Sequence, residues 1–288
     1  MSDPKISHAS PDAASADAAP QSEGKPWREE RTLRTSASPE QVYRAWADPE
    51  ILAQWFPDEA YGEAAPGEEL VHVWRDFGME LRHRVVEAVP NERLVLEGTS
   101  PMGFEFLQEI RIERDGDETV LRLVHSGFGP DADLSEELDG VDSGWRLALS
   151  TLRHYLEAHF GVARTSAALI VRPADFEWEQ AARFFRDEER LARWLTHSGS
   201  IGPEGSRCRL EIVGAGPLSG RVLAVTGREV AVSWEELPGI LELKAFGAAR
   251  GQRMVGVRLS SWGAPRERLV PALDGLRPAV ERLAAAFG

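Results

Sequence analysis

The strongest constraint on how this chain of 288 residues can fold is an internal repeat. The segment SPEQVYRAWADPEILAQWF at residues 38–56 aligns with EWEQAARFFRDEERLARWL at residues 177–195, and this alignment matches Trp55 with Trp194. The similarity returns at a slightly shorter spacing, where RVVEAVPNERLVLEG parallels GRVLAVTGREVAVSW. Self-similarity over such a distance predicts one fold that is present in two copies.

The length also favours two domains of ordinary size. We expect a first domain over residues 26–161 and a degenerate second domain over residues 164–288. Residues 1–25 are mainly Ala, Ser, Asp and Pro, and they lack the apolar content that a folded segment needs. They also lack the hydrophobic stretch of a secretory signal, so we expect a disordered tail there.

The overall charge restricts the kinds of partner that the protein can have. A net charge of −14 argues against nucleic acid, because phosphate binding needs a basic surface, and equally against an anionic membrane. No apolar run approaches the length of a membrane span. Cys208 is the only cysteine, so no internal disulfide can form, which fits the reducing cytoplasm.

The first copy has the pattern of a strand, two short helices, a meander of strands and one long helix. Ser38-Pro39 and Asp48-Pro49 each place a capping residue before a proline, which is typical of a helix start. Short turns such as Asp115-Gly116 separate consecutive strands and favour an antiparallel sheet. The predicted strands are residues 27–36, 70–77, 80–89, 93–97, 104–114 and 119–126, followed by a polar loop at 130–142 and a helix over about 143–160.

Alternation along these strands indicates which side chains face inward. Phe104, Phe106 and Gln108 share one face of their strand with two isoleucines, and His125 ends the inward face of the last strand. These side chains are therefore expected to look into the space beneath the sheet.

The long helix carries an apolar stripe that can close this space. Trp145, Leu149, Leu152 and Leu156 recur on it at helical spacing, and no other predicted helix is long enough to cover the sheet. The sequence thus predicts the α+β class: a curved antiparallel sheet wrapped around a long C-terminal helix, an arrangement called a helix grip, present in tandem.

Several segments of the first copy resemble a known family. DPEILAQWF, PNERLVLEG and LRLVHSGFG, followed by Gly144-Trp145 before the long helix, are similar to an activator-of-heat-shock-protein-ATPase-type (AHSA-like) domain of the START-like, or SRPBCC, superfamily. The resemblance covers about residues 27–161. It implies a deep apolar ligand cavity between sheet and helix, although the superfamily includes lipid carriers, polyketide cyclases and co-chaperones, so that fold alone does not settle function.

The second copy resembles the same family more weakly. Ser261 stands at the position that matches His125, and Pro271, Gly275 and Pro278 predict a final helix that is kinked or split. We therefore expect this copy to have a structural or pairing role rather than a ligand cavity.

The candidate site residues each allow a functional and a structural interpretation. His125 could bind a ligand or shuttle a proton, or it could be satisfied by the backbone and fix the strand end. Gln108 needs a partner inside the core, which could be a ligand, a water or a neighbouring side chain. The aromatic residues could line a pocket or simply pack. The predicted ligand-binding set is Trp55, Trp74, Phe104, Phe106, Gln108, His125, Trp145, Leu149 and Leu152.

Metal and nucleotide chemistry find little support. His72 and His83 lie on neighbouring predicted strands but lack a third ligand, and His154 and His159 are spaced five apart on a helix. Ser219 stands where a dinucleotide turn needs its third glycine, and no Walker loop, nucleophile elbow or HExxH motif occurs. We predict no catalytic residue, no metal and no cofactor.

The leading hypothesis is a cytoplasmic, non-catalytic protein that binds a small hydrophobic molecule in the first copy. The first alternative is a protein-interaction module whose partner is a chaperone or another protein, with a role in the stress response. The second alternative is an enzyme of the polyketide-cyclase type, which would need inward polar groups to converge on one pocket. No nucleic acid and no membrane is expected as a partner.

Overall fold

The computed structural model describes residues 25–101, 103–129, 135–172, 176–248 and 252–287. The tail predicted for residues 1–25 lies outside the described residues except for its last residue, Lys25, which begins the first strand. Among the described helices, none has both the length and the apolarity to cross a membrane. We call the elements from β1 to α3 the first repeat and those from β8 to α6 the second repeat; the domain limits given above stay a prediction.

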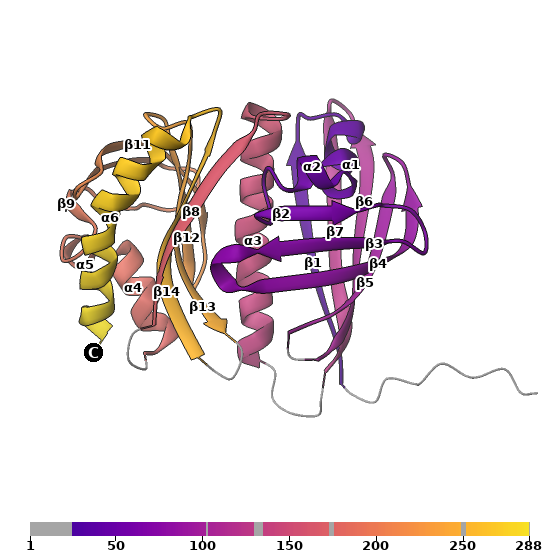
Figure 1. The fold of residues 1–288 in the computed structure, drawn as a ribbon, viewed down its shortest axis with the longest axis horizontal. Coiled ribbons are helices and arrows are strands. Elements are labelled where there is room, and N and C mark those ends of the chain that lie inside the picture. The colour runs from indigo at the N-terminus through magenta and orange to yellow at the C-terminus, as the bar shows by residue number, and fades with distance from the viewer. Residues whose placement is uncertain (1–24, 102, 130–134, 173–175, 249–251, 288) are drawn as a thin grey trace, which may run out of the picture.

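Both repeats have the same order of elements, a strand, two short helices, six strands and a long helix (Figure 1). The first repeat comprises β1 (Lys25–Thr35), α1 (Pro39–Ala47), α2 (Pro49–Leu52), β2 (Glu59–Gly62), β3 (Glu69–Trp74), the short 3-10 helix η1 (Arg75–Phe77), β4 (Met79–Val89), β5 (Arg93–Thr99), β6 (Glu105–Asp115), β7 (Glu118–Gly129) and α3 (Ser135–Ala158). The second comprises β8 (Arg164–Val171), α4 (Trp178–Arg186), α5 (Glu188–Leu191), β9 (Thr196–Ser198), β10 (Arg207–Ile212), β11 (Gly216–Val225), β12 (Glu229–Trp234), β13 (Gly239–Ala248), β14 (Gln252–Trp262) and α6 (Arg266–Phe287).

The two sheets also share one topology. The first sheet has the strand order β1-β7-β6-β5-β4-β3-β2, and the second has β8-β14-β13-β12-β11-β10-β9. Each pairing within the described residues is antiparallel, and the first and last strands of each repeat lie side by side at one edge. The predicted class, a tandem α+β helix grip, is confirmed.

The two tryptophans that align in the sequence make equivalent hydrogen bonds in the two repeats. Trp55 donates its indole N–H to the Ala45 carbonyl over 2.7 Å, and Trp194 donates to the Phe184 carbonyl over 2.9 Å. Each bond satisfies a carbonyl in the last turn of the first short helix, where intrahelical partners run out. The start of α1 is fixed by a capping box, in which Ser38 and Gln41 exchange hydrogen bonds with each other's backbone.

The repeats stack into four layers, in the order α6, second sheet, α3 and first sheet (Figure 1). Helix α3 therefore packs on two sheets: on β1 of its own repeat and on β11, β12 and β13 of the other. The core cluster around α3 accordingly includes Ala224, Ala231, Ile240 and Trp262 from the second repeat. The two repeats thus share one continuous core at α3.

Both faces of the second sheet are consequently covered. Along β12, Val230 and Val232 belong to the core beneath α6, whereas Ala231 between them belongs to the core around α3. All six residues of this strand are buried. A strand that is covered on both sides reads as a continuous apolar run rather than as an alternating one.

The long helix of the first repeat begins earlier than expected. The sequence predicted a loop at 130–142 and a helix over about 143–160, but α3 runs from Ser135 to Ala158. Its first turns lie beside the second repeat, where Arg228 forms an ion pair with Asp139 over 2.7 Å. Tertiary contacts of this kind extend a helix into a segment whose local sequence is polar. Residues 130–134 of the predicted loop lie outside the described residues.

The final helix of the second repeat was predicted to be kinked or split; it is continuous, so the predicted split is wrong. Helix α6 runs unbroken from Arg266 to Phe287 with Pro271 and Pro278 inside it, both exposed to solvent, where the missing hydrogen bonds can be replaced by water. Gly275 lies against Gly214 so closely that a Cβ on Gly275 would stand 1.9 Å from the Gly214 carbonyl oxygen. This glycine therefore allows close packing and does not end the helix.

Candidate functional site

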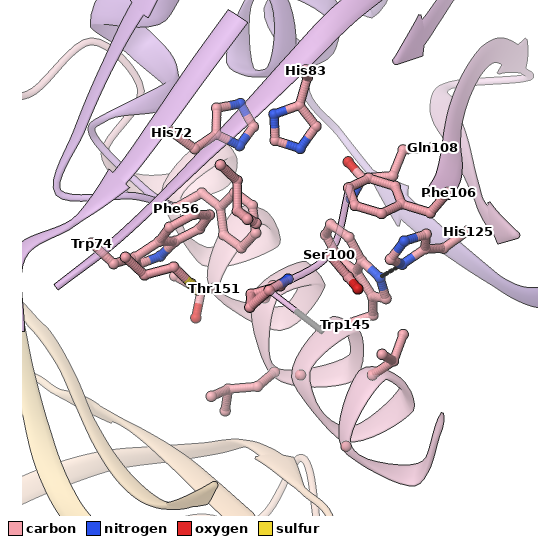
Figure 2. A pocket seen from close by; sticks show the side chains of 18 of the residues that line it. Phe56, His72, Trp74, His83, Ser100, Phe106, Gln108, His125, Trp145 and Thr151 are labelled. Carbon is pink, nitrogen blue, oxygen red and sulfur yellow. Dashed lines mark hydrogen bonds between the residues drawn. The ribbon is translucent and has the colours of Figure 1, made fainter. Parts of the chain in front are cut away.

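A cavity of about 390 Å³ lies between the first sheet, helix α3 and the facing side of the second sheet (Figure 2). Its walls come from β1, β3, β4, β6 and β7 of the first sheet, from the helix side that carries Gly144, Trp145 and Ala148, and from strands β8, β13 and β14. The volume falls within the range of about 300–1,000 Å³ that is usual for small-molecule sites. The space lies between the sheet and the long helix of the first repeat, with an additional wall from the second repeat.

A connected group of aromatic rings forms one side of the cavity. Phe56 stacks on Trp55 at 5.0 Å and on Trp145 at 5.5 Å between ring centroids, and it meets Trp74 edge to face at 5.3 Å. Such ring pairs add about 0.5–1.5 kcal/mol beyond area burial. These walls are held in place by one another and offer flat apolar surface to a ligand.

His125 is fixed by a hydrogen bond that crosses from the sheet to the helix. Trp145 on α3 donates its indole N–H to Nδ1 of His125 on β7 over 2.8 Å, the contact marked in Figure 2. Because Nδ1 accepts, the neutral ring carries its proton on Nε2. That Nε2 is buried and has no hydrogen-bond partner among the described residues. His125 thus presents an unsatisfied donor at the cavity wall.

His72 and His83 lie side by side on β3 and β4, as Figure 2 shows, with their ring centroids 4.3 Å apart. Both side chains are about 1% exposed. Within the described residues, neither ring nitrogen of His72 has a hydrogen-bond partner, and Nδ1 of His83 has none. Burying a polar group without a partner costs about 1–3 kcal/mol, so these nitrogens call for a partner inside the cavity, such as a water or a ligand.

Gln108 completes the polar groups of the first sheet. It lies on β6 directly opposite His125 of β7, is 5% exposed, and lines the cavity. Its Oε1 is buried and finds no donor among the described residues. A carboxamide can donate and accept, so this side chain can match either kind of group on a ligand.

Burial keeps the three cavity histidines neutral. Loss of water lowers the pKa of His83 to about 4 against a hydrogen bond with the Leu70 backbone, which acts in the opposite direction. Loss of water, and next the proximity of His83, lowers the pKa of His125 to about 4 and the pKa of His72 well below its ordinary value. At neutral pH this part of the cavity is polar but uncharged.

The opposite end of the cavity is charged and belongs to the second repeat. Arg164 on β8, Glu242 and Lys244 on β13, and Arg258 on β14 all contribute to the lining. Arg258 forms an ion pair with Asp58, which stands just before β2 in the first repeat. One cavity therefore joins an aromatic, histidine-bearing chamber to a charged end.

The structure brings most of the predicted site residues together. Seven of the nine line the cavity, and the two exceptions, Leu149 and Leu152, lie in the hydrophobic core instead. The cavity faces the helix line that includes Trp145, Ala148 and Thr151, so that the adjoining leucines pack against neighbouring side chains. The seven lining residues are Trp55, Trp74, Phe104, Phe106, Gln108, His125 and Trp145. Their role in binding stays a prediction.

Sequence reasoning missed three groups of lining residues. His72 and His83 were weighed only as metal ligands, although alternation places His72 on the same face as Trp74 two residues later. Trp27 and Phe56 carried no comparable signal. The four charged residues of the second repeat could not be found locally, because their place depends on how the repeats stack.

The described part of the chain contains no cluster of three His, Cys, Asp or Glu side chains that could hold a metal ion. The His154 and His159 pair approaches to 3.3 Å between Nε2 atoms, and His159 stacks on Trp262 at 4.7 Å between ring centroids. Two imidazoles packed on an indole at the contact between repeats form a packing feature rather than a site with open coordination positions.

Comparisons with known proteins found a matching family model and a number of similar solved structures. The family model described as Activator of Hsp90 ATPase homolog 1-like protein matches residues 36–157. A comparison with curated proteins gave no match.

Solved structures with similar folds include the Aha1 dimer from Colwellia psychrerythraea, at 21% identity over 47% of this chain and 99% of that chain, with a TM-score of 0.40. DynU16, from the dynemicin biosynthetic locus, is 18% identical over 91% of this chain and 99% of that chain, with a TM-score of 0.40. CalU16 from Micromonospora echinospora is 21% identical over 47% of this chain and 86% of that chain, with a TM-score of 0.38.

Proposed function

We propose, starting from the membership of residues 36–157 in the Activator of Hsp90 ATPase homolog 1-like family, that this protein binds a small hydrophobic molecule without transforming it. The ligand would occupy the cavity between the first sheet and α3. The observation that carries the proposal is a cavity of about 390 Å³ with aromatic walls and several buried polar atoms that lack partners within the described residues.

The energetics of those polar atoms favour a ligand over plain packing. Gln108, His72, His83 and His125 together leave five buried nitrogen and oxygen atoms without a partner in the described structure. Each such atom costs about 1–3 kcal/mol when it stays unsatisfied. Buried polar groups normally have hydrogen-bond partners, and a bound molecule with hydroxyl or carbonyl substituents would supply them here.

The arrangement also limits what the ligand looks like. The Nε2–H of His125 requires an acceptor on the ligand, whereas Oε1 of Gln108 requires a donor. The flat faces of Phe56 and Trp145 suit a planar ring system. A ring compound with both hydroxyl and carbonyl groups meets these requirements.

Filling the cavity tests the proposal. Native mass spectrometry of freshly purified protein should show a bound small molecule, and added ligand should raise the melting temperature. Ala148→Phe would place a ring in the cavity and should abolish both effects. Ala158→Phe, at the exposed end of the same helix, is the matched control and should change neither. Equal ligand effects in the two variants would refute the site.

Protein interaction is the second candidate, and the family description favours it, because it names an Hsp90 ATPase as the target of related proteins. The large hydrophobic residues that the described surface exposes are single and spread over both repeats, which gives a partner little apolar area. An ATPase assay with an Hsp90-type chaperone tests this role. Stimulation that survives Ala148→Phe would establish it independently of the cavity.

An enzymatic role of the polyketide-cyclase type has gained one supporting feature. Polar side chains do converge on one pocket, namely His72, His83, Gln108 and His125. However, a pKa near 4 makes His83 and His125 weak bases at neutral pH, where general base catalysis works best with a matched pKa. Binding is therefore the better account. Turnover that is lost in His125→Ala while binding is retained would reverse this order.

A further inference from the structure

The second repeat contributes a charged wall to a cavity whose other walls are apolar or neutral. Arg164, Glu242, Lys244 and Arg258 all reach it from one sheet, and three of these four side chains are cationic. Thr151 on α3 joins them and donates a hydrogen bond to Oε1 of Glu242 over 3.4 Å. A family domain without this second repeat would lack the whole wall.

Two of the three cations already have carboxylate partners. Arg258 pairs with Asp58 and also contacts Ser166 at 3.3 Å. Lys244 lies 3.4 Å from Oε1 of Glu229 and 3.7 Å from Oε2 of Glu242. Burial lowers the pKa of Lys244, but these two carboxylates outweigh that effect and raise it, so the amine is charged at neutral pH.

Arg164 is the cation that lacks such a partner. Its backbone N–H donates to Oε1 of Gln54 over 2.7 Å, and its guanidinium donates to the Pro57 carbonyl. Within the described residues no carboxylate lies within ion-pair distance of it. A guanidinium has five N–H donors, so most of its capacity stays unused. Burial, and next the repulsion from Arg258, lowers the pKa of Arg164 to about 9, whereas the nearby charges of Asp58 and Glu242 act in the opposite direction without pairing directly with it. The guanidinium therefore stays charged at neutral pH.

We infer that the second repeat completes the ligand site, and that Arg164 binds an anionic group on the ligand. This inference rests on the proposed function and narrows the ligand to an amphipathic organic acid. Its ring system would occupy the chamber of Phe56, His72 and Trp145, and its carboxylate or similar group would lie at Arg164. An arginine pairs well with such a group because two parallel N–H donors match its two oxygens.

The second repeat thereby gains a specific task beyond packing. Its sheet covers α3 with apolar residues and at the same time brings a cation to the end of the cavity. A neutral molecule of the same shape would leave the unused N–H donors of Arg164 without an anionic acceptor. The site is therefore expected to select for charge at one end and for shape at the other.

Two fluorescent probes with the same ring body test the inference. Anilinonaphthalene sulfonate carries an anionic group, and N-phenylnaphthylamine is its neutral counterpart. We expect the wild-type protein to prefer the sulfonate and Arg164→Gln to reduce this preference by about tenfold, the effect of one charged hydrogen bond. Arg164→Lys, which keeps the charge, should retain most of it. The exposed Arg193→Gln is the matched control and should retain all of it.

The outcomes separate this inference from the proposed function. An unchanged preference in Arg164→Gln, with both probes still displaced by Ala148→Phe, would overturn the inference alone. Failure of both probes to bind the wild-type cavity would count against the proposed function as well. If Arg164→Gln weakens the neutral probe by more than about threefold, the site itself is disturbed, and Arg164→Lys then decides: a retained preference for the sulfonate supports the inference, and a lost preference overturns it.

Discussion

The indole N–H of Trp145 donates to Nδ1 of His125 over 2.8 Å and thereby ties the long helix of the first repeat to the last strand of its sheet. The bond assigns the ring proton of His125 to Nε2, which faces no partner among the described residues. Helix position and histidine tautomer are thus set by one contact. A ligand that accepts from Nε2–H would complete a chain of hydrogen bonds from α3 to the ligand.

Removing the indole N–H of Trp145 should allow His125 to exchange between its two neutral tautomers. In Trp145→Phe, Nδ1 of His125 stays buried and loses the one donor that the described residues give it. We therefore expect the free energy of unfolding to fall by about 1–3 kcal/mol beyond the effect of the lost volume. Nitrogen NMR of the His125 ring should show a shift from the Nε2–H form toward a mixture of tautomers. Urea unfolding and the NMR spectrum measure the two effects.

The matched control for this substitution is Trp46→Phe. Trp46 is a buried neighbour whose indole nitrogen has no partner within the described residues, so the change removes the same atoms without breaking a hydrogen bond. The ring of His125 should keep its Nε2–H form in this variant. The same tautomer mixture in both variants would show that the bond to Trp145 does not set the proton position.

The stability of the protein should depend on pH through its buried histidines. Burial lowers the pKa values of His83, His125 and His154 to about 4, and it places that of His72 well below its ordinary value. Between about pH 6.5 and pH 4 the unfolded chain therefore binds more protons than the folded one, and the free energy of unfolding falls as the pH falls. Each such histidine contributes a slope of up to about 1.4 kcal/mol per pH unit.

Urea unfolding at a series of pH values checks this slope. The variant His154→Gln removes one of these histidines, so the change of the free energy of unfolding with pH should decrease by the contribution of one titrating group. The same change at the exposed His197 serves as the control for the substitution itself. A free energy of unfolding that is constant from pH 6.5 to pH 4 would contradict the burial of neutral imidazoles.

Much of the fold follows from local patterns in the sequence. The caps at Ser38 and Asp48 start α1 and α2 in the structure, as predicted, because a side-chain acceptor and a proline at the first turn act within a few residues. The four-residue strand β2 was missed, since it is too short to show alternation. The continuous helix α6 was also missed, because the role of Gly275 depends on contact with a distant loop.

The site residues also fall into two groups: those that local sequence patterns predict and those whose position depends on how the repeats pack. Alternation placed Phe106, Gln108 and His125 on the inner face of the sheet, where they line the cavity. The charged wall from Lys244 and Arg258 was not foreseen, because no local pattern tells which face of the second sheet meets α3. Residues 230–232 of β12 did carry a signal, because three consecutive apolar residues are typical of a strand that is covered on both faces.

A glycine beside the cavity should control its width. Gly98 lies opposite Phe106 on the neighbouring strand, and a Cβ there would stand 2.7 Å from Cζ of the Phe106 ring. Because the Phe106 ring lines the cavity, a ring displaced by this Cβ changes the shape of that wall. Gly98→Ala should therefore weaken binding of the neutral naphthylamine probe by several-fold and change the melting temperature little.

Gly247→Ala is the control for this substitution. Gly247 lies in β13, and an added Cβ would meet no atom within 4 Å. Probe titrations of both variants give the comparison. Unaltered binding in Gly98→Ala would mean that the Phe106 ring does not border the ligand.

The ion pair between Asp58 and Arg258 should hold the two repeats together at the charged end of the cavity. The partners are 200 residues apart in sequence, and their side chains are 10% and 6% exposed. Removing one partner of a buried pair leaves an uncompensated charge, so Asp58→Asn should lower the free energy of unfolding by about 3–5 kcal/mol. The double variant with Arg258→Met should lose less stability than the sum of the two single losses, because it leaves neither member of the pair as a lone buried charge.

The exposed pair of Arg84 and Glu97 on the first sheet is the reference, and its coupling energy should be below about 1 kcal/mol. A coupling for Asp58 and Arg258 no larger than this surface value would show that the repeats are joined by the apolar contacts of α3 alone.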